Sequence, residues 1–120
     1  MRASWGWVMG WAVLIEALVL WPHPPEVPQA FAFVGLDKLV HATLFAVQAA
    51  LAARALREAS RPWWPALVGA IAFGALTEYQ QHFIPSRSME LGDFLADSTG
   101  ALVGLAVFVA WAQKRREQHR

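Results

Sequence analysis

The chain has 120 residues, of which 57% are hydrophobic and only 16% are charged. Soluble domains carry charge on about a quarter of their residues, so this composition does not fit an ordinary water-soluble globule. Seven Trp and seven Phe exclude a disordered chain, and the absence of Cys excludes disulfides and thiolate metal sites. The net charge of +1 gives no support for nucleic-acid binding, so we expect no nucleic-acid partner.

Apolar stretches long enough to cross a membrane, which takes roughly 20 residues, occur four times along the chain. We expect helices over about residues 3–21, 36–57, 62–84 and 93–113. The first stretch is followed by a proline-rich segment rather than by a small-residue cleavage site, so we expect an uncleaved helix. The sequence therefore predicts an all-α fold, a polytopic four-helix membrane bundle that forms a single domain over residues 1–120.

The distribution of Lys and Arg predicts the orientation of this bundle, because cytoplasmic loops carry an excess of basic residues. If both termini are cytoplasmic, only Lys38 and Arg87 lie on the outer side. The other eight basic residues then lie inside: Arg2, Arg54, Arg57, Arg61, Lys114, Arg115, Arg116 and Arg120. We therefore expect a multi-pass protein with an N-in, C-in orientation, surrounded by the lipid bilayer.

Two pairs of glycines with i,i+4 spacing predict close contacts between helices. They are Gly6 with Gly10 and Gly100 with Gly104. Glycine is frequent in membrane helices, so we favour ordinary packing over a specific dimer, and the sequence leaves the oligomeric state open.

The predicted topology gathers the ionisable residues of the last three helices at the outer end of the bundle. Pairs three or four residues apart share a helix face in each of these helices: Asp37 with His41, Glu78 with Gln81 and with His82, and Asp93 with Asp97. Charged groups at membrane depth are costly and usually face a cavity or a partner. The cluster is therefore a candidate functional site.

Counting the loop before the last helix, this cluster has two fixed positive charges against five negative ones. A net charge of minus three near the membrane needs compensation by a bound proton, a protonated histidine or a bound cation. Simpler roles stay open for some members: Asp37 and Asp93 could be helix N-caps, and Lys38 could extend to the lipid headgroups. Glu78 lies too deep for comfortable hydration, and Arg87 is a basic residue against the overall bias, so we interpret both as functional.

Three polar motifs occur in order between about residues 35 and 105: DKLVH at 37–41, GALTEYQQ at 74–81 and PSRSMELGDFLADSTG at 85–100. Together they resemble the VanZ-like family of small bacterial membrane proteins. Its pattern is approximately D-K-x-x-H, a helix ending in E-x-x-Q, and P-x-R-S followed by D-x-x-x-N and a glycine. This chain departs from the pattern at Asp97, where the family usually has Asn, and at Ser86, where glycine is common.

The resemblance implies a bacterial cell-envelope protein of the cytoplasmic (inner) membrane. The member that gives the family its name is linked to resistance against glycopeptide antibiotics of the teicoplanin type, and no settled biochemical activity comes with the family. The residues that the resemblance carries over are Asp37, Lys38, His41, Glu78, Gln81, Arg87, Asp93 and Asp97.

Three functions fit the cluster, and the sequence does not decide whether the protein is an enzyme. In the first, the site binds or processes an envelope component, such as a lipid-linked or peptidoglycan-related precursor. Lys38 and Arg87 would hold its phosphate or carboxylate, while Glu78 and His41 would supply acid–base catalysis. The remaining binding candidates are Asp37, Gln81, Asp93 and Asp97.

In the second function, the protein is not an enzyme: its polar network stiffens the bundle, moves a proton or small solute, or modulates another envelope protein. In the third, the carboxylates and histidines bind a divalent metal. No established metal-binding spacing such as H-E-x-x-H is present, so we rank this third and expect neither a metal nor a cofactor.

Overall fold

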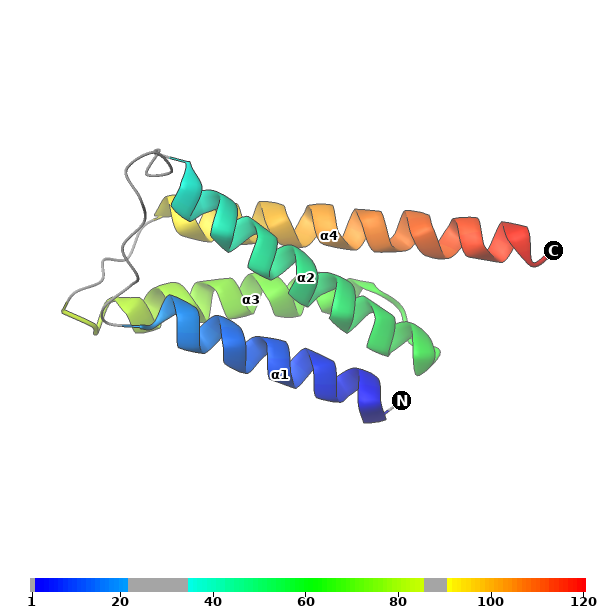
Figure 1. Cartoon of the computed structure of the whole chain (residues 1–120), viewed down its shortest axis with the longest axis horizontal. Helices are drawn as coiled ribbons and strands as arrows, with labels where there is room; N and C mark the ends of the chain where they lie inside the picture. Colours follow the sequence, from blue (N-terminus) through cyan, green and yellow to red (C-terminus); the bar gives the residue numbers. More distant parts are fainter. Residues whose placement is uncertain (1, 22–34, 86–90) are drawn as a thin grey trace.

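The computed structural model of the chain describes residues 2–21, 35–85 and 91–120. The helices within these ranges are α1 (Arg2–Val19), α2 (Leu36–Glu58), α3 (Trp64–Gln81) and α4 (Leu91–Gln118). They form an elongated bundle with both termini at the same end (Figure 1). No strand is present in the described ranges, so the predicted all-α four-helix fold is confirmed.

The helix ends differ from the predicted ones where hydropathy is a poor guide. α4 continues to Gln118, past the predicted end at residue 113, because a helix can extend its last charged turns out of the membrane. α3 is shorter than predicted at both ends, and Trp63 is its N-cap residue, with a proline in the first turn where proline is tolerated. α2 ends at Glu58, and Ser60 follows with a φ of 56°, a left-handed conformation that stops the helix.

A contact between backbones joins α2 and α4. A Cβ atom at Gly100 would stand 2.0 Å from the carbonyl oxygen of Ala42, and the nearest α2 carbonyl to a Cβ at Gly104 would be 2.1 Å away. The backbones of the two helices are therefore in direct contact at Gly100 and Gly104, as predicted for these glycines, and we call this contact the glycine seam. No described atom lies within 4 Å of a Cβ built at Gly6 or Gly10, so the contact predicted there is not made within the described chain.

Alanine forms much of the core between the last three helices. The buried side chains of Ala49, Ala70 and Ala101 meet from α2, α3 and α4. The next layer again contains two alanines, Ala53 and Ala66. Small side chains let helix backbones approach closely, which is how helices associate where no water is available to drive them together.

α1 packs on this assembly with larger side chains. Ile15 and Val19 of α1 form a buried cluster with Leu44 and Phe45 of α2. The indole N–H of Trp11 donates a hydrogen bond to the carbonyl oxygen of Leu44 at 2.8 Å. The position of α1 is therefore fixed mainly by α2.

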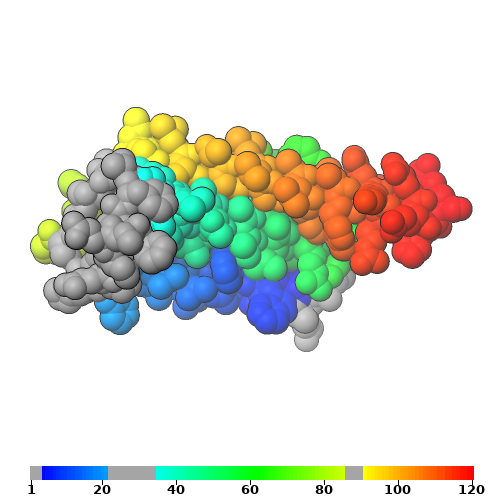
Figure 2. Space-filling view, turned by 45° about the horizontal axis from the view of Figure 1, so that its top comes forward, coloured from blue at the N-terminus to red at the C-terminus, as the bar shows by residue number. Residues whose placement is uncertain are grey.

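Large apolar side chains cover the outside of the bundle. Trp7 and Val13 are each 66% exposed, and Val107 is 64% exposed. Figure 2 shows the end of α4 extending beyond the other helices. In the described part of the chain, α2 and α4 are long and apolar enough to cross a membrane, and Ser4–Val19 is a shorter apolar helix. Such a surface fits contact with lipid, and two of the four predicted spans meet the length and composition of a membrane helix.

The seam between α2 and α4 predicts different effects for two equal substitutions. Gly100→Ala should lower the free energy of unfolding in detergent by about 1–3 kcal/mol, because the added methyl group overlaps the Ala42 carbonyl. Gly10→Ala is the matched control and should be neutral or slightly stabilising, since alanine favours helix and nothing lies near it. Thermal unfolding measures both variants, and equal midpoints would contradict the contact.

The orientation expected from the basic residues can be tested at the two ends of the bundle. The wild-type chain has no Cys, so single cysteines can be labelled without background. Pro85→Cys should react with a membrane-impermeant maleimide in intact cells, whereas Ser60→Cys should react only after the cells are permeabilised. Reaction of both positions from the same side would rule out the N-in, C-in orientation.

Candidate binding and catalytic site

Buried ionisable residues gather at the end of the bundle opposite to the termini, where α2 begins, α3 ends and α4 begins (Figure 1). We call this the polar end. Its buried residues include His41, Glu78, Asp93 and Asp97, and each of them is at most 4% exposed. Burying such groups costs free energy unless they are paired, so the geometry of the pairs decides what the site can do.

The innermost pair joins His41 of α2 to Asp97 of α4. The Nδ1 atom of His41 lies 2.8 Å from Oδ1 of Asp97, and both side chains are buried. With Asp97 ionised, Nδ1 carries a proton and its N–H donates a hydrogen bond to the carboxylate. This bond fixes the imidazole ring and leaves Nε2 as the nitrogen that can accept a proton or bind a ligand.

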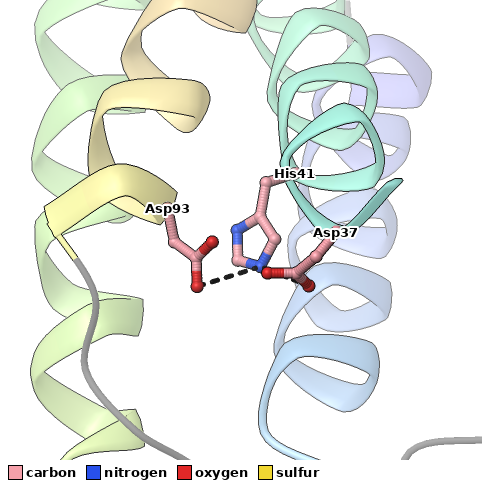
Figure 3. A group of neighbouring side chains, drawn as sticks. All are labelled: Asp37, His41 and Asp93. Atoms are coloured by element: carbon pink, nitrogen blue, oxygen red, sulfur yellow. Dashed lines mark ion pairs between the residues drawn. The ribbon is translucent and has the colours of Figure 1, made fainter. Parts of the chain in front are cut away.

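Nε2 of His41 points between two further carboxylates (Figure 3). It lies 3.8 Å from Oδ1 of Asp37 and 3.9 Å from Oδ2 of Asp93. The ammonium group of Lys38 lies 2.6 Å from Oδ1 of Asp93 and 3.5 Å from Oδ2 of Asp37. The Asp37 side chain is 57% exposed and that of Asp93 is 6% exposed, so the cluster leads from the surface into the bundle.

Glu78 extends the cluster to α3. One atom each from His41, Glu78 and Asp97 lies within 4.8 Å of the others. Gly74 makes room for this approach, because a Cβ there would stand 3.2 Å from Cβ and 3.3 Å from Oδ2 of Asp97. Sequence reasoning missed the role of Gly74, although a glycine one turn before a membrane-depth glutamate is a signal that could have indicated it.

Gln81 is placed differently from the other predicted residues. It is 2% exposed, and its Nε2 donates a hydrogen bond to the carbonyl oxygen of Val19 at 2.8 Å. That carbonyl belongs to the last turn of α1, where helix carbonyls lack partners within the helix. The hydrogen bond gives Gln81 a structural role that ties the end of α3 to the end of α1.

The N-cap roles considered for the two aspartates do not match the geometry. The N-cap of α2 is Gly35, without a side-chain hydrogen bond, and Asp37 lies in the first turn of the helix. α4 begins at Leu91, so Asp93 lies within its first turn, where it accepts a hydrogen bond from Lys38. Lys38 therefore contacts an aspartate of a neighbouring helix.

The described members of the cluster carry excess negative charge. Asp37, Glu78, Asp93 and Asp97 stand against Lys38, a formal net charge of minus three before His41 is counted. Arg87, which was predicted to bind an anion or carboxylate, lies outside the described residues, as does the loop acid at position 90. In surroundings with little water, such an imbalance favours bound protons or cations.

A groove of about 660 Å³ lies away from the polar end, between α2 and α4 near the termini. Its wall includes Val47, Leu51, Phe108 and Trp111, with arginines at one end. This mostly apolar wall suits lipid chains, whereas the groups capable of acid–base or ligand chemistry lie at the polar end.

The profile of the VanZ/LLP1 family matches residues 4–112, which include every described residue of the polar end. No curated protein and no solved structure matches the chain. The family match covers most of the chain and agrees with the motifs at 37–41, 74–81 and 85–100.

The pairing of His41 with Asp97 predicts opposite outcomes for two substitutions of the aspartate. Asp97→Asn should be nearly neutral or mildly stabilising, because the amide oxygen can accept the Nδ1 proton and one buried negative charge is removed. Asp97→Leu has a similar size but no acceptor, and should cost about 1–3 kcal/mol because it leaves a buried N–H without a partner. Thermal unfolding in detergent compares them, and severe destabilisation by Asp97→Asn would contradict the excess of negative charge.

Proposed function

Because the chain belongs to the VanZ/LLP1 family, we propose that it is a multi-pass protein of the bacterial inner membrane that binds or processes a cell-envelope component at its polar end. The component is a lipid-linked or peptidoglycan-related molecule that carries a phosphate or carboxylate group. In the expected N-in, C-in orientation the polar end faces the extracytoplasmic side, where such molecules are assembled into the wall.

The observation that carries the proposal is the buried hydrogen bond of 2.8 Å between His41 and Asp97. Burying ionisable groups inside a membrane protein costs free energy, and well-packed apolar residues could hold two helices together as firmly. A role in stability alone therefore does not explain why these residues are charged. An imidazole oriented by a carboxylate is suited to take a proton from a bound molecule and return it. Glu78, which has an atom within 4.8 Å of both, would be the second acid–base group.

Binding would be the task of the outer part of the cluster. The Lys38 side chain is 36% exposed, so its ammonium group can reach a ligand that approaches along the surface. Asp37 and Asp93 hold that ammonium at 3.5 and 2.6 Å. Arg87 would add a second cation for the phosphate or carboxylate, a role that rests on its position in the sequence.

A second candidate function needs no catalysis. The hydrogen bonds from Lys38 to Asp93 and between His41 and Asp97 both join α2 to α4, so they could serve as a buried network that stiffens the bundle or conducts a proton. The two functions differ in what substitution should do. Loss of a network lowers stability, whereas loss of a site removes binding and phenotype while the fold remains.

We expect the protein to lower susceptibility to teicoplanin when it is expressed in a susceptible bacterium, and to retain an envelope lipid when it is purified. His41→Asn and Glu78→Gln should abolish the change in the inhibitory concentration, because they remove the acid–base groups. Lys38→Met should remove the lipid, measured by mass spectrometry of the extract, because it removes the cation that holds the anionic group.

Matched controls carry the same chemical changes at exposed positions. His119→Asn and Glu117→Gln should keep both the phenotype and the lipid, since both residues lie on the surface far from the polar end. Protein level in the membrane and unfolding temperature are measured for every variant. If the site variants keep the phenotype and the lipid while their unfolding temperatures fall, the cluster is a structural network and the proposed function is wrong.

A further inference from the structure

The charge at the polar end poses a problem for any anionic ligand. Within the described residues Lys38 is the only fixed cation of the cluster, and its ammonium already lies 2.6 Å from Asp93 and 3.5 Å from Asp37. A phosphate or carboxylate brought to this place would meet several carboxylates at close range. Because like charges repel strongly where little water is present, a further positive charge is needed between them.

The geometry around His41 indicates where that charge belongs. Nδ1 is engaged by Asp97 at 2.8 Å, so Nε2 is the nitrogen that remains for a ligand. The imidazole side chain is 5% exposed, and Nε2 is aimed between Asp37 at 3.8 Å and Asp93 at 3.9 Å, beyond hydrogen-bonding distance of either (Figure 3). A buried nitrogen directed at two carboxylates, without a hydrogen bond to them, is arranged as a ligand would require.

The three groups are also close enough to share one ion. One atom from each of Asp37, His41 and Asp93 lies within 4.8 Å of the other two. Metal–nitrogen and metal–oxygen bonds of about 2.0–2.2 Å put neighbouring ligand atoms of a tetrahedral site about 3.3–3.6 Å apart. Nε2 of His41 lies 3.8 and 3.9 Å from the two carboxylate oxygens, so each of these two separations needs to shorten by only a few tenths of an ångström. The Asp37 side chain, which is 57% exposed, has room to move.

From this geometry we propose that Asp37, His41 and Asp93 bind one divalent cation of the zinc type, and that Asp97 is the positioning residue that aims Nε2 at it. One imidazole and two carboxylates are ligands that Zn²⁺ accepts, and three protein ligands leave a fourth position open. A carboxylate on the far nitrogen of a ligating histidine fixes the ring and its tautomer.

This inference deepens the proposed function, because the open position would let the cation bind the anionic group of the envelope component. The cation would bring the positive charge that the cluster lacks. Lys38 competes with the cation for Asp93. Its side chain, which is 36% exposed, can turn toward the surface and there contact the same anionic group, so that both positive charges hold the ligand. The roles of ligand, competitor and positioning residue give three substitutions with different expected effects on metal affinity.

The test measures metal binding without any envelope ligand, so its result is separate from the outcome of the lipid and teicoplanin experiments. The full chain is purified in detergent through a tag without histidine, stripped with a chelator and titrated with Zn²⁺. We expect one Zn²⁺ per chain by elemental mass spectrometry. His41→Asn and Asp93→Asn should weaken binding by more than about tenfold in calorimetry.

Two further pairs of variants make the assignment specific. Lys38→Met should bind Zn²⁺ more tightly than the wild type, because the competing ammonium is gone. Asp97→Leu should weaken binding by about 10–100-fold, whereas Asp97→Asn, which still accepts the Nδ1 proton, should stay close to the wild type. His82→Asn and His119→Asn are the controls for adventitious binding at exposed histidines.

The proposal is overturned if stoichiometric Zn²⁺ is absent, if binding survives His41→Asn, or if binding is lost in the exposed-histidine controls. Asp37→Asn guards against unfolding as an explanation, since Asp37 is half-exposed and its amide variant should fold. If that folded variant binds Zn²⁺ as tightly as the wild type, Asp37 is not a ligand and the site is wrongly assigned.

Discussion

The contact between the backbones of α2 and α4 brings together the paired polar groups of these two helices at the polar end. His41 directly precedes Ala42, and Asp97 lies one turn before Gly100, whose Cβ position overlaps the Ala42 carbonyl. Where the two helices touch, the imidazole and the carboxylate are therefore brought to 2.8 Å. One turn closer to the start of α4, the same approach brings Asp93 to the ammonium of Lys38. The glycine seam and the polar cluster are thus parts of one arrangement, in which separating the helices would break both pairs.

Side-chain exposure decreases from the start of α2 toward the interior of the bundle. The Asp37 side chain is 57% exposed, Lys38 is 36% exposed, and Asp97 is fully buried. Within the described residues, the start of α2 is therefore the exposed side of the cluster, and His41 and Asp97 lie further inside. In the proposed function, a ligand approaches from the start of α2 and meets acid–base groups that are shielded from bulk water.

The sequence predicted the four helices and the common depth of the polar residues because hydrophobic length and i,i+4 spacing depend on single helices. It could not predict which helix faces meet. Gly6 and Gly10 have the same spacing as Gly100 and Gly104, yet in the described chain only the second pair lies against another helix. Gln81 had the right depth and face for the cluster, but it donates to the last turn of α1, whose position no local pattern specifies.

The same limit explains why Gly74 was missed and the alternatives for Asp37 and Lys38 were kept open. A glycine in a membrane helix has many uses, and only the approach of Asp97 from another helix gives this one a purpose. An aspartate at a helix start is compatible with a cap, and only the actual start of α2 at Gly35 and Leu36 removes that role from Asp37. The roles of these residues depend on contacts between helices, which the pattern within a single helix does not predict.

The alanine layers between α2, α3 and α4 invert the usual pattern of mutational tolerance. In a core of large side chains the damaging changes are truncations, because they leave cavities. Ala49, Ala70 and Ala101 have only a methyl group to lose, so truncation leaves hardly any empty space here. Enlargement is the damaging direction, since each added carbon separates helices that also carry the polar pairs. These faces are therefore expected to tolerate only the smallest residues, and an apparently conservative change from alanine to valine would disturb the polar pairs one to two helical turns away.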